Sequence, residues 1–247
     1  MTTNLPGVTG ATALVTGASR GIGAAIARHL AAAGAVVSIT GRDVEALESV
    51  RASLGPEARA VPAELTDSAS VAALAEEIGP VDLVVANAGG QGHPVSIVDM
   101  TDEQWHNTVD TNLTSVFHTL RAFLPGMIAS GRVAVVTMSS TAGRQPSPAS
   151  PAYGAANAGL LMLTRQVALQ MAEHGVRVNA IAPGSTETER LATLMPPEAR
   201  SRLAAAHPLG RLGTMDDIAR AALFLLSDNA SWITGATLDI NGGRIMA

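Results

Sequence analysis

A glycine-rich segment near the N-terminus holds the first residues whose types and spacing could do chemistry. It reads Thr16-Gly17-Ala18-Ser19-Arg20-Gly21-Ile22-Gly23 and lies between a β-branched run and a segment of helical periodicity. Glycines permit positive φ angles and let backbone N–H groups approach a pyrophosphate at the N-terminus of a helix. The spacing differs from G-x-G-x-x-G, so it is mainly the placement between strand and helix that predicts a dinucleotide-binding loop.

Two arginines indicate which dinucleotide this loop would take. A carboxylate at the end of the second strand binds the ribose 2′-hydroxyl of NAD(H), but here Gly41 occupies that position and Arg42 follows it. Arg20 inside the glycine loop adds a second guanidinium, and two guanidiniums can hold a phosphate dianion. We therefore expect NADP(H) rather than NAD(H). Asp43 could equally begin the next helix or contact the ribose.

The composition excludes several other kinds of site. The chain has no cysteine, so it has no disulfide, thiol nucleophile or thiolate metal site. Its six histidines, at positions 29, 93, 106, 118, 174 and 207, show no short metal-ligand spacing, so no metal is expected. All 16 basic residues are arginine, which excludes Schiff-base chemistry on a lysine.

The net charge and the distribution of apolar residues indicate which partners and which cellular location to expect. The net charge is −5 and the basic residues are scattered, so a nucleic-acid partner is not expected. No N-terminal signal pattern and no stretch of about 18 apolar residues is present, so we expect a cytoplasmic protein that does not bind membranes.

Seven short apolar runs alternate with longer alanine-rich segments of helical periodicity. This alternation predicts one α/β domain over residues 1–247, with a doubly wound, seven-stranded parallel sheet of the Rossmann type. The expected strands are Thr12–Thr16, Val36–Thr40, Ala58–Pro62, Val81–Ala86, Arg132–Met138, Val176–Ile181 and Thr237–Ile240.

Capping residues and prolines predict two helix starts and one insertion. Thr101 and Gln104 form a capping-box pattern, which begins a helix near Asp102. Ser150 is a cap with Pro151 at the first helical position, so Tyr153 falls in the first turn of that helix. The prolines within residues 185–213 predict short helices in an excursion that shapes a pocket.

Several motifs together resemble the short-chain dehydrogenase/reductase (SDR) family over nearly the whole chain, in particular its 3-oxoacyl-acyl-carrier-protein reductases. Besides residues 16–23, they are Ala86-Asn87-Ala88-Gly89, Asn112, Ser140, Tyr153, Asn179, Pro183-Gly184 with Thr188, Ile233-Thr234-Gly235 and Asn241-Gly242-Gly243.

The resemblance implies a carbonyl reductase or alcohol dehydrogenase with hydride supplied by a nicotinamide. In that chemistry Tyr153 exchanges the proton, Ser140 hydrogen-bonds the substrate oxygen, and Asn112 matches the position that holds a water of the proton relay. Further cofactor-binding positions carried over from the family follow the glycine loop and the strand ends. The expected set is Gly17, Ser19, Arg20, Gly21, Ile22, Gly23, Arg42, Glu64, Leu65, Asn87, Ala88, Gly89, Tyr153, Asn157, Pro183, Gly184, Thr186 and Thr188.

Asn157 is the main departure from the family. Residues 153 and 157 share a helical face, and relatives place a lysine at the second position to hold the nicotinamide ribose and favour the tyrosinate. Asn157 is an amide, and the chain has no lysine with which to replace the missing one. An ammonium about 4 Å from a phenolate is worth about 4 kcal/mol at an effective dielectric constant near 20. Carbonyl reduction starts from a neutral phenol, so the loss should impair alcohol oxidation more than reduction.

Three functions remain open. The first is an NADPH-dependent reductase of a ketone or 3-oxoacyl-type carbonyl, favoured because the chain's only tyrosine occupies the family's catalytic position. The second is an impaired, dinucleotide-binding regulator or partner subunit, and the third is a lyase, isomerase or dehalogenase on the same fold. The intact glycine loop argues against the third.

The substrate and the oligomeric state are only loosely constrained. Residues 141–152 and 185–213 should line the pocket, and their composition suggests a largely apolar carbonyl compound. The helices near Trp105–Met127 and Ala152–Glu173 have small, apolar outer faces. The family resemblance implies that such helices pair, so a homotetramer is expected, with a dimer as the next alternative.

Overall fold

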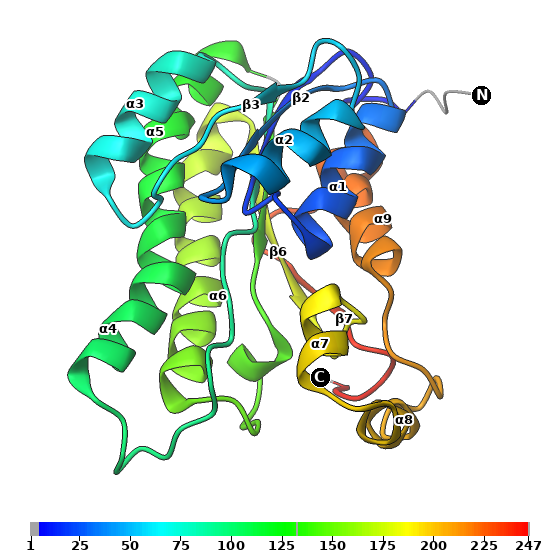
Figure 1. Ribbon diagram of the computed structural model, residues 1–247. Coiled ribbons are helices and arrows are strands. Elements are labelled where there is room, and N and C mark those ends of the chain that lie inside the picture. The colour runs from blue at the N-terminus through cyan, green and yellow to red at the C-terminus, as the bar shows by residue number, and fades with distance from the viewer. Residues whose placement is uncertain (1–4, 132, 247) are drawn as a thin grey trace.

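The computed structural model describes residues 5–131 and 133–246, in which seven parallel strands form one sheet (Figure 1). The strand order is β3-β2-β1-β4-β5-β6-β7. The strands are β1 (Thr12–Thr16), β2 (Val36–Thr40), β3 (Arg59–Ala60), β4 (Leu83–Ala86), β5 (Val133–Met138), β6 (Val176–Pro183) and β7 (Thr237–Ile240). The predicted fold class is confirmed.

All seven predicted strands form, and β1, β2 and β7 have the predicted bounds. The edge strand β3 is shorter than predicted, although Val61 and Ala63 still donate to the carbonyls of Ile39 and Gly41 at 3.0 and 3.2 Å. Strand β6 runs two residues further than predicted, paired with β7 up to Pro183. Position 132 of the predicted fifth strand lies outside the described residues.

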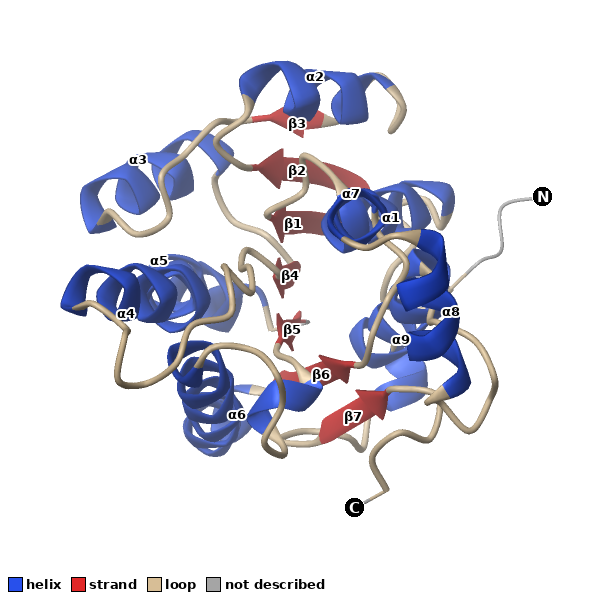
Figure 2. Cartoon of the chain, turned by 60° about the horizontal axis from the view of Figure 1, so that its bottom comes forward, coloured by secondary structure: helices blue, strands red, loops and turns tan. Residues whose placement is uncertain are grey.

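Helices cover both faces of the sheet, as Figure 2 shows. The helices are α1 (Gly21–Ala32), α2 (Val44–Ala52), α3 (Ser68–Ile78), α4 (Asp102–Val109), α5 (Ser115–Ser130), α6 (Pro151–Met171), α7 (Glu189–Leu194), α8 (Pro197–Ala205) and α9 (Met215–Leu226). Helices α1 and α9 lie on one face and α3, α5 and α6 on the other. None of the helices in the described ranges is long and apolar enough to cross a membrane.

Two aliphatic cores separate these helices from the sheet. Ile26, Leu30 and Leu225 are buried in the core on the α1 and α9 face. Leu120 and Leu160 are buried in the core on the other face. Burying such side chains gives about 1.5–3 kcal/mol each, so the two cores hold the strand ends in fixed relative positions.

The predicted helix starts are confirmed by their caps. Thr101 and Gln104 form both hydrogen bonds of a capping box at the start of α4. The Ser150 hydroxyl accepts from the Tyr153 N–H at 3.3 Å, and Pro151 begins α6. Tyr153 therefore lies in the first turn of α6, as predicted.

The sheet order reverses direction between β1 and β4. In open α/β sheets, ligands bind at such a point, in the crevice at the carboxyl ends of the strands. The segment at residues 185–213 forms α7 and α8, which in Figure 1 lie near the ends of β6 and β7. The predicted excursion thus consists of two short helices beside the crevice.

Asp217 makes the stability of the α9 start depend on pH. Hydrogen bonds from Arg211, together with the Thr214 N–H, hold the pKa of Asp217 well below its ordinary value. A depressed carboxyl pKa gives stability that is present above the unfolded value of about 4 and is lost on acidification below it.

We predict that Asp217→Asn lowers the free energy of unfolding by about 1–2 kcal/mol near pH 7 and by less at pH 3. Denaturant titrations of both proteins at the two pH values measure this difference. A deficit that is the same at both pH values would show that the charge of Asp217 contributes nothing.

Candidate functional site

The glycine loop after β1 is packed so tightly against the loop after β4 that side chains would not fit. A Cβ at Gly17 would lie 2.7 Å from the Ala88 Cα, and one at Gly23 would collide with the Gly17 carbonyl oxygen. Gly17 also has a φ of +62° and Gly21 a φ of +58°. Both glycines therefore adopt the left-handed conformation that a phosphate-binding turn requires.

The N-terminus of α1 is suited to an anion. Among the described residues no side chain caps it, and its first turn contains no acidic residue. The side of Gly21 is open, since a Cβ there would meet only the Thr188 methyl group, at 4.0 Å. Ile22 packs against the core behind the loop. Uncapped N–H groups at a helix N-terminus beside a glycine turn fit the pyrophosphate of a dinucleotide.

Asn87 holds the loops after β1 and β4 together. Its Nδ2 donates to the carbonyls of Thr16 and Gly17, both at 3.1 Å. The N–H groups of Asn87 and Ala88 in turn donate to the Thr16 hydroxyl. Asn87 is therefore a structural link between the two loops, and Ala88 and Gly89, which we expect near the cofactor ribose, follow it in the loop after β4.

The two arginines expected at a 2′-phosphate are each paired with a carboxylate. Arg20 lies 2.7 Å from Asp43, and Arg42 lies 3.8 Å from Glu64. Asp43 also caps α2 by accepting from the Ala46 N–H at 3.1 Å. All four charged side chains are at least 44% exposed, so these pairs are weak and can rearrange around a ligand.

The other residues that we expect on the adenosine side of the cofactor lie near these charges. Ser19 lies beside Gly41, which follows β2: a Cβ added at Gly41 would be 3.6 Å from the Ser19 Oγ. Leu65 is buried next to Glu64. Glu64 is also engaged locally, since its Oε1 accepts from the Thr66 hydroxyl at 2.8 Å.

The segment Pro183–Thr188 forms the wall of the crevice opposite the glycine loop. Gly184 packs on Asn241, where a Cβ would be 2.9 Å from the Asn241 Cα. Thr186 forms a bridge with Gly213, and Thr188 caps α7 by accepting from the Leu191 N–H. The structure thus brings the predicted residues of this segment and of the glycine loop to one crevice.

The turn that carries Ser140 is docked on the backbone of α6. Ser139 donates to the Asn157 carbonyl at 3.2 Å. A Cβ at Gly143 would be 2.7 Å from the Asn157 carbonyl carbon, so only glycine fits at this contact. The Ser140 hydroxyl accepts from the Ala142 N–H at 3.1 Å.

Tyr153 is half-buried in the first turn of α6, on the same helix on which the Ser140 turn rests. The turn contacts α6 at residue 157, one helical turn beyond Tyr153. This docking fixes Ser140 and Tyr153 relative to each other.

Asn157 is committed to its own helix. It is 2% exposed, and its Nδ2 donates to the Tyr153 carbonyl at 2.9 Å. One of its two amide hydrogens is therefore already used. As an uncharged group, the amide supplies hydrogen bonds but no cationic field.

Asn112 lies in a π-helical segment, Asp110–Thr114, between α4 and α5. Its side-chain oxygen accepts from the Gly90 N–H at 2.9 Å, and its Nδ2 donates to the carbonyls of Gly90 and Thr108. The side chain therefore holds the loop after β4. A π-helical turn also leaves backbone groups of the helix displaced from regular pairing, as is frequent at functional sites.

Three of these features were not predicted from the sequence. For Gly143 a usable signal exists, because it is a glycine three residues after the serine expected to be catalytic. The pairing of Asp43 with Arg20 has no sequence signal, because their side chains meet only in three dimensions. The π-helical turn at Asn112 has none either.

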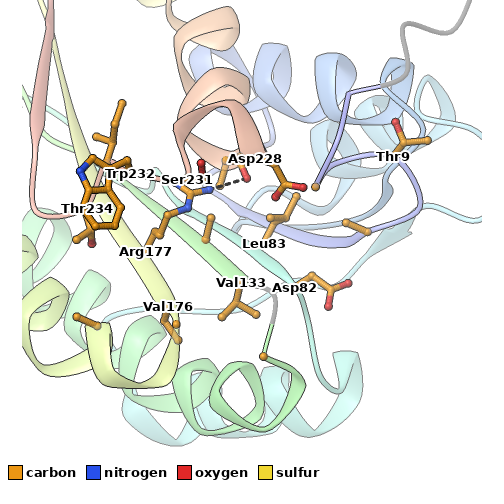
Figure 3. A pocket seen from close by; sticks show the side chains of 18 of the residues that line it. Thr9, Asp82, Leu83, Val133, Val176, Arg177, Asp228, Ser231, Trp232 and Thr234 are labelled. Atoms are coloured by element: carbon orange, nitrogen blue, oxygen red, sulfur yellow. Dashed lines mark hydrogen bonds between the residues drawn. The ribbon is translucent and has the colours of Figure 1, made fainter.

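Figure 3 shows the lining of a hollow of about 680 Å³. Its lining includes Asp82, Val133 and Val176, which precede or begin strands, so it lies at the opposite end of the sheet. Arg177 in its wall donates to the carbonyls of Leu225, Leu226 and Ser227 at the end of α9. Burial lowers the pKa of Arg177. None of the predicted site residues lines the hollow, and Arg177 caps the C-terminal end of α9.

A protein-family model described as enoyl-(acyl carrier protein) reductase matches residues 17–244. The 3-oxoacyl-acyl-carrier-protein reductase FabG of Escherichia coli is 39% identical over 241 residues, which cover 96% of this chain and 98% of the relative. The cis-4-hydroxycyclohexanecarboxylate dehydrogenase of Sinomonas cyclohexanicum is 41% identical over 238 residues, with 94% and 95% covered. A solved structure of a short chain dehydrogenase/reductase family protein superposes with a TM-score of 0.89 at 40% identity, covering 96% of this chain and 97% of that one.

The contact between Gly143 and α6 gives a prediction. Gly143→Ala should cost about 1–3 kcal/mol of unfolding free energy, because the new methyl group pushes the Ser140 turn off α6. Thermal and denaturant unfolding measure the cost. Gly126→Ala in α5 is the matched control, since its Cβ would meet Pro80 atoms at an ordinary 3.8 Å and alanine favours a helix. A Gly143→Ala protein as stable as the control would contradict the docking described above.

Proposed function

Because this chain belongs to the short-chain dehydrogenase/reductase family of oxidoreductases, we propose that it is an NADPH-dependent reductase of a ketone or 3-oxoacyl-type carbonyl. The observation that carries the proposal is the docking of the Ser140 turn on the helix that begins with Tyr153. In this proposal both side chains face the dinucleotide bound at the carboxyl ends of the strands.

The protein's own groups divide the work in this proposal. Ser140 donates its hydroxyl hydrogen to the carbonyl oxygen of the substrate, which orients the carbonyl and polarises it. Tyr153 supplies the proton that this oxygen takes up as the alcohol forms. Bound NADPH supplies the hydride that reduces the carbonyl carbon. Asn112 holds the loop after β4 through its hydrogen bonds to Gly90. In the family, this position holds a water of the proton relay.

Cofactor binding in this proposal uses the glycine loop for the pyrophosphate and Arg20 with Arg42 for the 2′-phosphate. The segment Pro183–Thr188 would face the nicotinamide, and Asn157 would offer its second amide hydrogen to the ribose. Arginine forks suit a phosphate dianion, and their exposure leaves them able to reach it.

The fold also supports a homotetramer as part of the proposal. Trp105, Phe117, Met162 and Leu169 are between 37% and 74% exposed on α4, α5 and α6. Large apolar side chains gathered on neighbouring helices are typical of surfaces that pair with another copy.

A screen of NADPH oxidation over ketones and 3-oxoacyl thioesters tests the proposed function. We expect turnover of at least one carbonyl class, and Ser140→Ala should reduce the rate about 100-fold while leaving NADPH affinity unchanged. Tight NADPH binding with no turnover of any carbonyl would overturn the proposal in favour of a dinucleotide-binding regulator. The chain has no lysine, and the absence of the lysine expected at position 157 is what favours this alternative.

The missing lysine gives a second prediction. Asn157→Lys should accelerate alcohol oxidation more than carbonyl reduction, because an ammonium near the phenol favours the tyrosinate that oxidation requires. The two rates are measured on the same substrate pair at neutral pH. Asn157→Gln is the uncharged control, and an effect of equal size in both directions would count against the electrostatic explanation.

The carboxylates paired with Arg20 and Arg42 give a third prediction about the proposed function. Asp43→Asn removes a charge that competes for Arg20 but keeps a capping side chain for α2. We expect NADP⁺ to bind several-fold more tightly and NAD⁺ to bind as before, with a gain that shrinks at high salt. Calorimetry with both dinucleotides measures this, and Glu45→Gln on the same helix is the control. Equal changes for both dinucleotides would contradict a role at the 2′-phosphate.

A further inference from the structure

The ion pair between Arg144 and Asp239 differs from the other ion pairs of the described residues. The Arg144 NH2 group lies 3.1 Å from an Asp239 carboxylate oxygen, and each side chain is only 19% exposed. Every other pair in the described ranges has at least one side chain that is more than half exposed. Solvent therefore weakens this pair least.

Arg144 holds the segment between the two proposed catalytic side chains. It directly follows the turn Thr141–Gly143, which begins after Ser140. Residues 145–148 beyond it are mostly exposed, and the chain then reaches Ser150 and Tyr153. Within this connection, Arg144 is the residue whose side chain forms an ion pair with another element.

Asp239 lies on the frame of the opposite wall. It is on the edge strand β7, in register with Ala182 of β6, immediately before Pro183–Thr188. Asn241, two residues later, packs on Gly184, and Gly242 lies against His207 of the excursion. The pair therefore joins the Ser140 turn to the strand that supports the proposed nicotinamide wall.

The Asp239 carboxylate depends on Arg144. Its Oδ1 is buried and accepts no hydrogen bond from any residue in the described ranges. Loss of the guanidinium would leave a largely buried negative charge without its partner, and the strand or the turn would have to move to hydrate it. Small displacements of reacting groups are costly for catalysis.

We propose that Arg144 and Asp239 are positioning residues that fix the Ser140 turn relative to the wall facing the nicotinamide. The pair touches neither substrate nor cofactor; it acts through Ser140 and Pro183–Thr188. This proposal rests on the proposed reductase function.

The first test uses Asp239→Asn and Arg144→Gln in the full-length protein, with Arg59→Gln as the control because it breaks an exposed pair with Glu77. With a carbonyl that the wild type reduces, kcat should fall roughly 10- to 100-fold in both variants. NADPH deuterated at the transferred position should show a larger isotope effect on kcat, because misaligned hydride transfer limits the rate. The affinity for NADPH should change less than twofold, and Arg144→Lys should recover part of kcat.

A merely structural pair would behave differently. The variants would then unfold at a lower temperature but keep the wild-type kcat and isotope effect well below that temperature, and this result would overturn the proposal.

The second test does not require turnover, so it separates this proposal from failure of the reductase function. Hydrogen exchange should become faster in Asp239→Asn at residues 139–149 and also at 183–188, but not in α1. Faster exchange confined to β7 would overturn the proposal even if the wild type reduces no carbonyl.

Discussion

The contact between the Ser140 turn and the backbone of α6 is the constraint on which the proposed chemistry depends. A serine at a strand end and a tyrosine in a helix can act on one carbonyl only if the strand and the helix are locked together. The lock has few parts: the Ser139 hydrogen bond to the Asn157 carbonyl, the close approach of Gly143, and a buried hydrogen bond of 2.7 Å between the Thr137 and Thr164 hydroxyls. The docking point is the backbone of Asn157, the position at which the family resemblance leads us to expect a lysine.

The expected dinucleotide-binding end combines a fixed backbone with exposed charged side chains. The glycine turn and the uncapped start of α1 are rigid and preformed, whereas the charges around Arg20 and Arg42 are exposed and already paired. Rigid backbone groups can bind a pyrophosphate without rearrangement. In the proposed NADPH complex the paired arginines would have to exchange a carboxylate for a phosphate, so the proposed preference for NADPH would depend on a balance of charges and not on the presence of arginine alone.

Sequence patterns predicted most of the fold because its signals are local. Alternating apolar runs indicated the seven strands, and Thr101 and Ser150 with their partners indicated two helix starts that the structure confirms. The ion pairs of Asp43, Glu64 and Asp239 could not be predicted, since each joins residues from different elements. The π-helical turn at Asn112 also has no local signal. The roles of the predicted site residues remain predictions.

The most direct test of a proton delivered by Tyr153 is a single turnover with NADPH already bound. Tyr153→Phe removes the phenol hydroxyl and keeps the ring, so the packing at the start of α6 is preserved. Hydride transfer to a ketone that the wild type reduces should then slow at least ~100-fold, with unchanged affinity for NADPH. A rate equal to that of the wild type would show that the proton comes from another group.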